Sequence, residues 1–131
     1  MPGKPRFIMC TCGGQCPGFA KIEVWPFINR ARDQLDVEYA IVHPQLCVDD
    51  GDRFLKDIVK PDAVYVFGAC DCRMQRKLFG QALEAAGVDV DKNVVFVELK
   101  GSTTEEAYEK VKAAVADALR GPGAEQLKEE G

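Results

Sequence analysis

The sequence has no excess of basic residues, no long apolar run and no apolar leader at its amino terminus. Its 131 residues include 17 Lys and Arg against 21 Asp and Glu, for a net charge of −4. This balance argues against nucleic-acid or anionic-membrane binding, which needs a basic surface. No apolar stretch approaches the roughly 20 residues that span a bilayer, and no signal-peptide core precedes the first apolar run. We therefore expect a cytoplasmic protein that is not inserted in a membrane.

Several motifs of familiar redox sites are also missing. No Gly-x-Gly-x-x-Gly follows the first predicted strand, so the chain shows no dinucleotide or flavin motif. The Cys-x-x-Cys pair of thioredoxin-like proteins is absent as well. The single histidine, His43, could be a ligand or a proton relay, but a lone loop histidine is usually neither.

Six cysteines are unusual in a chain of this length. An even number could form three disulfides, but disulfide frameworks belong to small secreted domains with poor cores. Here 47% of the residues are apolar, enough for one ordinary hydrophobic core. In a reducing compartment, clustered cysteines are more often metal ligands or redox-active thiols.

Strand-like and helix-like segments alternate along the chain. Each of four short apolar runs is followed by apolar residues at helical spacing. Four such units predict a single α/β domain, with a parallel sheet covered by helices on both faces. We expect a flavodoxin-like, Rossmann-type fold with strand order 2-1-3-4 over residues 1–121 and a polar tail over residues 122–131. The predicted strands are Arg6–Cys10, Val37–Val42, Ala63–Phe67 and Val94–Val97.

The predicted helices have recognisable ends and apolar stripes. Asp49 and Asp50 suit the cap of the second helix, and Gly87 suits the end of the third. Thr103 and Glu106 have capping-box spacing before the fourth helix. The expected buried stripes are Met74, Leu78, Ala82 and Ala85 on the third helix and Tyr108, Val111, Val115 and Leu119 on the fourth.

All six cysteines fall at or just beyond the ends of the first three predicted strands. The carboxyl ends of parallel strands share one edge of the sheet, where ligands bind at the topological switch point. We therefore expect the cysteines to gather there and form one site. They are Cys10, Cys12 and Cys16 after the first strand, Cys47 after the second, and Cys70 and Cys72 after the third.

Three chemistries use such a group of thiols. Iron–sulfur clusters prefer four thiolates, which often come from separated loops. Structural zinc usually takes Cys-x₂₋₄-Cys pairs, and only Cys12 and Cys16 have that spacing. A dithiol–disulfide couple is the third use. The spacing favours an iron–sulfur cluster, while thiolates alone leave the metal and the cluster type open.

Residues beside the cysteines suit an anionic cluster. Arg73, Arg76 and Lys77 occupy the predicted first turns of the third helix, where helix N–H groups and cations would stabilise thiolates. The same residues would also be ordinary as solvated surface charges. Gly13 and Gly14 either let backbone N–H groups approach cluster sulfurs or merely shape the turn. Gly13 and Arg73 are therefore the predicted cofactor-binding residues besides the cysteines.

Three motifs together resemble the N-terminal domain of the A-type polypeptide of heterodisulfide reductase, from flavin-based electron-bifurcating complexes. The resemblance covers about residues 6 to 119. It implies a 4Fe–4S cluster held by Cys10, Cys12, Cys47 and Cys70. It also implies a non-catalytic subunit that relays electrons between flavin- or iron–sulfur-containing partners. The motifs are Cys10-Thr-Cys12-Gly13, Cys47-Val-Asp49-Asp-Gly51 and Cys70-Asp-Cys72-Arg73-Met74.

Two cysteines depart from that family's pattern. Cys72 stands where the family usually has proline, and Cys16 is additional, so both are possible alternate ligands. The Cys12-x₃-Cys16 spacing and the Cys70–Cys72 pair also resemble the delta-type subunit of methyl-viologen-reducing hydrogenase, which implies a 2Fe–2S cluster. A thiol-based sulfur-transfer or dithiol redox protein and a structural zinc module are the remaining alternatives.

Overall fold

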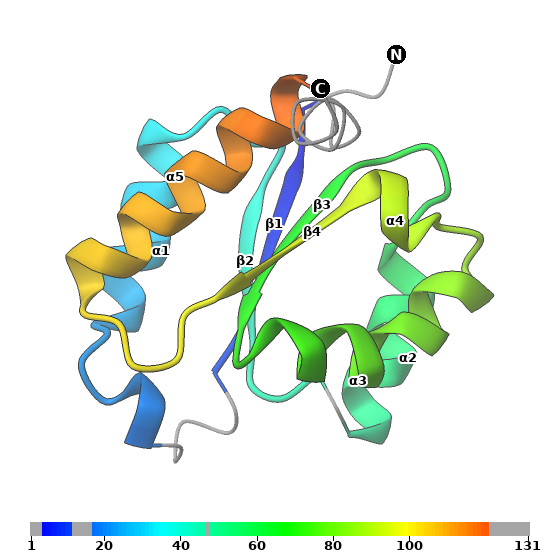
Figure 1. Cartoon of the computed structure of the whole chain (residues 1–131), viewed down its shortest axis with the longest axis horizontal. Coiled ribbons are helices and arrows are strands. Elements are labelled where there is room, and N and C mark those ends of the chain that lie inside the picture. Colours follow the sequence, from blue (N-terminus) through cyan, green and yellow to red (C-terminus); the bar gives the residue numbers. More distant parts are fainter. Residues whose placement is uncertain (1–3, 12–16, 47, 121–131) are drawn as a thin grey trace, which may run out of the picture.

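Residues 4–11, 17–46 and 48–120 are described by the computed structural model of the chain (Figure 1). Four parallel strands form one sheet in the order β2-β1-β3-β4, which confirms the predicted topology. The strands are β1, Arg6–Cys10; β2, Ala40–His43; β3, Tyr65–Ala69; and β4, Val94–Glu98. The predicted tail over residues 122–131 lies outside the described residues. No helix in the described ranges is long and apolar enough to cross a membrane.

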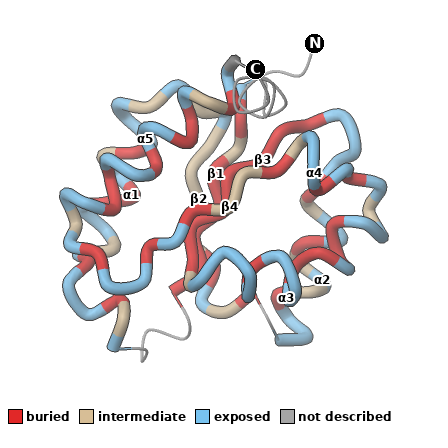
Figure 2. The backbone as a smooth tube through the Cα atoms, viewed as in Figure 1, coloured by how far each residue is buried: buried red, intermediate tan, exposed pale blue. Residues whose placement is uncertain are grey.

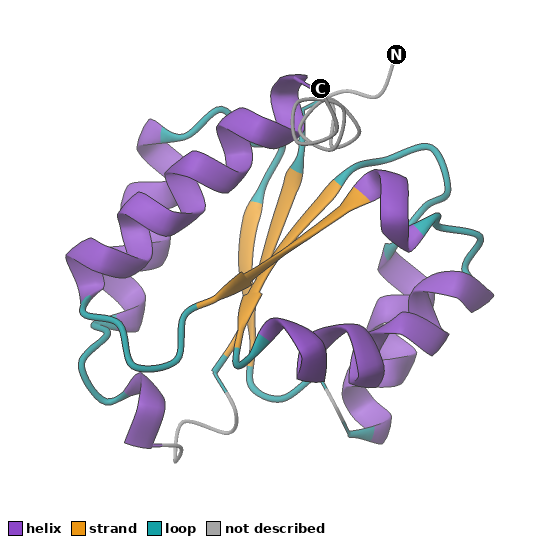
Figure 3. Ribbon diagram, in the orientation of Figure 1, coloured by secondary structure: helices purple, strands orange, loops and turns teal. Residues whose placement is uncertain are grey.

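Helices cover both faces of the sheet (Figures 1 and 3). Crossover connections between parallel strands share one hand, so a reversal of direction across the sheet moves the next helix to the opposite face. The chain goes outward from β1 to β2, then back across to β3 and on to β4. One face therefore carries α1, Val24–Gln34, and α5, Thr104–Arg120, and the other carries α2, Asp49–Ile58, α3, Cys72–Ala85, and the short α4, Val90–Asn93. A 3₁₀ turn, η2, spans Pro17–Phe19.

The two central strands are buried on both faces (Figure 2). Successive side chains of a strand point to opposite faces. Along β1, Phe7 and Met9 therefore face α1 and α5, whereas Ile8 and Cys10 face α2 and α3. All five residues of β3 are buried, which explains its nearly continuous apolar sequence.

The helix ends confirm two predictions and correct a third. Gly87 follows α3 with a φ of 86°, a conformation that favours glycine. Thr103 and Glu106 form the capping box, because each side chain accepts the other's backbone N–H, at 3.2 and 2.9 Å. The predicted cap by Asp49 or Asp50 is wrong, since α2 already includes both residues and its N-cap is Val48.

The predicted apolar stripes are partly wrong. Met74 and Leu78 are 46% and 39% exposed, and Leu119 in the last turn of α5 is 48% exposed. Ala85 is exposed as well, so Ala82 is the one residue of the predicted α3 stripe that is buried. Packing of Phe79 against Phe67, with ring centroids 5.9 Å apart, turns a different side of α3 toward the sheet. That buried side consists of Gln75, Phe79, Gly80, Ala82 and Leu83.

Candidate functional site at the carboxyl edge of the sheet

The ends of β1 and β3 bring Cys10 and Cys70 to the same edge of the sheet. Cys10 is the last residue of β1, and Cys70 directly follows β3. The two strands are neighbours, with Met9 opposite Gly68. They flank the switch point, because the chain leaves β1 in one direction and β3 in the other. Four further predicted ligand and cofactor residues lie outside the described residues: Cys12, Gly13, Cys16 and Cys47.

The side chains of Cys10 and Cys70 lie on opposite faces of the sheet. Cys10 is buried in the core beneath α2 and α3, whereas Cys70 is half-buried against the core beneath α1 and α5. If the register of β1 and β3 continues, Ala69 lies opposite Cys10. Cys70 is one residue further along, so its side chain points to the other face of the sheet. A group bound by both sulfurs would therefore sit beyond the strand ends, astride the edge. Within the described ranges, no three His, Cys, Asp or Glu side chains gather as a metal site.

The backbone supports the sulfur of Cys10. The N–H of Leu46 donates a hydrogen bond to Cys10 Sγ at 3.3 Å, and both residues are buried. An N–H donor fixes the direction of a sulfur ligand. Leu46 belongs to the β2–α2 connection, which in sequence also contains the predicted ligand at position 47. The β2–α2 connection therefore donates a hydrogen bond to one predicted ligand, Cys10, and contains another in its sequence, Cys47.

Gly51 lets α2 approach this connection closely. A Cβ added at Gly51 would overlap the backbone of Leu46, and a main chain yields less readily than a side chain. We expect Gly51→Ala to destabilise the fold by about 1–3 kcal/mol, the usual cost of overpacking. Urea unfolding of the metal-free protein measures the effect. Gly80→Ala is the control, since nothing lies within 4 Å of its added carbon; equal stability of the two variants would contradict the close approach.

His43 is already occupied on both ring nitrogens. Its Nδ1 accepts the N–H of Gln45 at 3.0 Å, so that nitrogen carries no hydrogen. Its Nε2 lies 2.9 Å from Asp50 Oδ2 and therefore donates to the carboxylate. The ring also packs on Phe54, with centroids 5.0 Å apart. His43, paired in register with Cys10, thus joins β2 to α2 and in this arrangement offers no lone pair to a metal.

Gln75 ties the Cys70 turn to β4, a role that the sequence pattern did not predict. Its side chain is fully buried, and Nε2 donates to the carbonyls of Cys70 at 2.6 Å and Val97 at 2.8 Å. Two carbonyl acceptors fix the orientation of the amide, because only its NH₂ can donate to them. Its Oε1 has no hydrogen-bond partner among the described residues. The sequence feature that could have indicated the burial of Gln75 is its position one helical turn before Phe79, because residues at that spacing lie on the same side of a helix.

Cys72 lies against β4. The N–H of Leu99 donates to the carbonyl of Ala69, so the backbone polar groups of Leu99 face β3. In a strand these groups point alternately to the two sides, so those of Phe96 and Glu98 face the outer side of β4, away from β3. Cys72 Sγ donates to the carbonyl of Phe96 at 3.3 Å and therefore lies along that outer side. Since β4 is an edge strand, Cys72 covers part of its open edge.

The surroundings of Cys72 also disfavour the thiolate. Burial raises the pKa of its thiol most, and the Glu98 and Asp71 carboxylates raise it further, against the opposing N–H of Glu98. We expect iodoacetamide to alkylate Cys72 more slowly in the folded protein than in the urea-unfolded chain at mildly alkaline pH, because the thiolate is the nucleophile. Fragment-ion mass spectrometry of the tryptic peptide, which also contains Cys70, assigns the alkylated thiol and measures its rate. Faster alkylation in the folded protein would instead identify an activated thiol.

Arg73 occupies the predicted place in the first turn of α3. The helix begins at Cys72 and is capped by Asp71, whose carboxylate accepts the N–H groups of Arg73 and Met74 at 2.8 and 3.2 Å. The Arg73 side chain is exposed. The turn between Cys70 and α3 is thus held by Asp71 from outside and by Gln75 from inside.

The fold and the described site define a doubly wound α/β protein with cysteines at the carboxyl edge of its sheet. No protein-family model matches the chain, and no curated protein matches it either. The resemblances to the reductase and hydrogenase subunits therefore stay predictions from the sequence motifs.

Proposed function

We propose that this protein binds an iron–sulfur cluster at the carboxyl edge of its sheet and transfers electrons through it. The observation that carries the proposal is the position of Cys10 and Cys70 at the ends of the two central strands, on either side of the switch point. Ligands of open α/β sheets bind at this crevice. The Leu46 N–H on Cys10 Sγ is the kind of contact that stabilises a sulfur ligand.

Cys12 and Cys47 complete the proposed ligand set, as the resemblance to the reductase domain implies. Four thiolates suit a 4Fe–4S cluster, and 2Fe–2S is the alternative. A bound cluster supplies a one-electron carrier. The chain's own residues place Cys10 and Cys70 on opposite faces of the sheet and bury Cys10 away from water. Burial and hydrogen bonds to the sulfurs would then set the reduction potential.

The proposed role is that of a non-catalytic subunit in an oxidoreductase complex of the heterodisulfide reductase type. Its partners would be flavin- or iron–sulfur-containing subunits, since the chain shows no nucleotide or flavin motif of its own. We place the protein in the cytoplasm, where cysteines stay reduced and available as ligands.

Metal and sulfide analysis of anaerobically purified protein tests the proposal. A brown protein with about four iron and four sulfide ions per chain is the expected result, and about two of each would favour the 2Fe–2S alternative. Stoichiometric zinc without iron would contradict the proposal in favour of a structural zinc module. Absence of both metals after reconstitution with iron and sulfide would favour a thiol-based protein.

A further inference from the structure

The outer side of α3 carries an exposed apolar pair at the cysteine edge. Met74 and Leu78 lie one helical turn apart and are 46% and 39% exposed, whereas the polar Gln75 between them is fully buried. Scattered single apolar residues are common on surfaces, but neighbouring ones rimmed by polar groups mark contact sites. The helix begins at Cys72, so this pair lies within the first two turns after Cys70.

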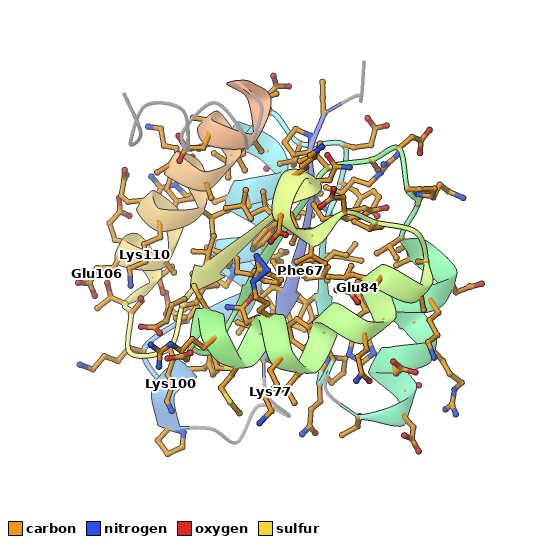
Figure 4. All side chains as sticks on the ribbon, turned by 45° about the vertical axis from the view of Figure 1, so that its right-hand side comes forward. Phe67, Lys77, Glu84, Lys100, Glu106 and Lys110 are labelled. Atoms are coloured by element: carbon orange, nitrogen blue, oxygen red, sulfur yellow. The ribbon has the colours of Figure 1, made fainter. Side chains whose placement is uncertain are left out.

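Basic side chains flank the pair. Arg73 and Lys77 are exposed and form no ion pair with another residue of the described ranges. Lys100, from the loop after β4, lies at the same edge as Lys77 (Figure 4). The one carboxylate of α3, Glu84, lies near the far end of the helix (Figure 4).

The middle of the patch is thus more basic than the whole chain, which carries −4, while Asp71 at the N-cap of α3 and Glu98 near Cys72 are the acidic residues at the start of the helix. Arg76 on the same helix is neutralised by Asp91 of α4, with an Nη1–Oδ1 distance of 2.8 Å. The first turn of α2, the helix that packs beside α3, is acidic. A complementary partner would therefore dock in one preferred orientation.

We propose that the outer side of α3 docks a small acidic electron-carrier protein, which exchanges electrons with the cluster. The α3 patch consists of Arg73, Met74, Lys77 and Leu78. Carboxylates of the carrier face the two cations and speed the encounter, while its apolar centre covers Met74 and Leu78. A small, partly apolar, charge-steered surface suits a transient redox complex. The proposal rests on the proposed function, since the cluster gives the carrier its electron acceptor.

Binding is tested separately from electron transfer. The ¹⁵N-labelled full chain is titrated with oxidised flavodoxin, a diamagnetic acidic carrier, at low ionic strength. We expect amide shifts centred on residues 73–78, which weaken as salt is added because exposed charges are screened. This readout does not depend on a cluster. Shifts centred on Trp25, the most exposed large apolar side chain among the described residues at 69%, or no saturable shifts, would overturn the proposal.

Charge reversal provides the matched control. Arg73→Glu combined with Lys77→Glu is expected to weaken flavodoxin binding roughly tenfold or more, whereas Lys60→Glu combined with Lys112→Glu leaves it unchanged. Lys60 and Lys112 are exposed, and they lie outside α3. In the cluster-loaded protein, the Lys77→Glu single variant should be reduced more slowly by reduced flavodoxin but at an unchanged rate by dithionite. If the two double variants weakened flavodoxin binding equally, the assignment of the docking site to the α3 patch would be overturned. So would self-association through α3 in place of flavodoxin binding.

Discussion

Replacement of Cys70 by serine is expected to remove most of the iron from anaerobically prepared protein, whereas replacement of Cys72 leaves the iron nearly unchanged. Cys70 follows a central strand at the switch point, while the Cys72 thiol lies along the outer side of β4 and donates to Phe96. Serine supplies a poor ligand in place of a thiolate, so loss of one ligand degrades the cluster. Iron and sulfide per chain, with the visible absorption spectrum, measure the effect.

Further variants refine the ligand set. Cys10→Ser and Cys47→Ser are expected to lose the cluster as Cys70→Ser does, and Cys16→Ser is expected to be milder. The Cys72→Ser protein is the matched control, since it removes a thiol only two positions from Cys70. Full retention of iron in Cys70→Ser together with its loss in Cys72→Ser would reverse the assignment and make Cys72 a ligand.

Replacement of Gln75 by leucine is expected to destabilise the fold by about 2–4 kcal/mol, because each buried carbonyl that loses its donor costs roughly 1–3 kcal/mol. The Nε2 of Gln75 donates to the part-buried carbonyl of Cys70 and to the buried carbonyl of Val97. Leucine has a similar volume but no donor, so both carbonyls lose this contact. Removal of the Oε1 atom, which has no partner among the described residues, offsets part of the cost. Urea unfolding of the metal-free protein measures the change.

The matched control is Gln81→Leu on the same helix. Gln81 is exposed, and substitutions at such positions usually change stability by less than about 0.5 kcal/mol. Gln75→Glu keeps the shape but presents a carboxylate to two carbonyls, so we expect it to be at least as destabilising as the leucine variant. Equal stability of Gln75→Leu and Gln81→Leu would show that Gln75 does not hold the Cys70 turn.

The topology could be predicted from the sequence because it follows from simple alternation. Four apolar runs, each followed by a helical segment, leave few arrangements that respect the handedness of crossovers. Local chemistry was equally readable in the reciprocal capping of Thr103 and Glu106 and in the positive φ of Gly87. The short helix α4 was missed, since its four residues, Val90–Asn93, are too few for helical periodicity to register.

The rotation of α3 could not be predicted in the same way. Met74 and Leu78 fit an apolar stripe as well as Phe79, Ala82 and Leu83 do, and only tertiary contacts decide which side is buried. The carbonyls at the Cys70 turn and at β4 require a donor that Gln75 provides, whereas Met74 would not. Sequence periodicity carries no information about such a requirement.

For the candidate site, the sequence predicted where the cysteines lie along the chain but not which way their side chains point. Cysteines after parallel strands lie at one edge by topology, as Cys10 and Cys70 do. Which face each side chain takes depends on strand register, and a shift of one residue reverses it. The support of Cys10 Sγ by Leu46 and the position of Cys72 beside β4 depend on contacts between segments distant in sequence.

Low-temperature electron paramagnetic resonance of the dithionite-reduced protein tests the central claim most directly. A cluster at the carboxyl edge predicts a fast-relaxing signal of about one spin per chain, present in the Cys72→Ser protein and lost in the Cys10→Ser and Cys70→Ser proteins. A reduced protein that shows no signal and contains one zinc ion per chain would contradict it.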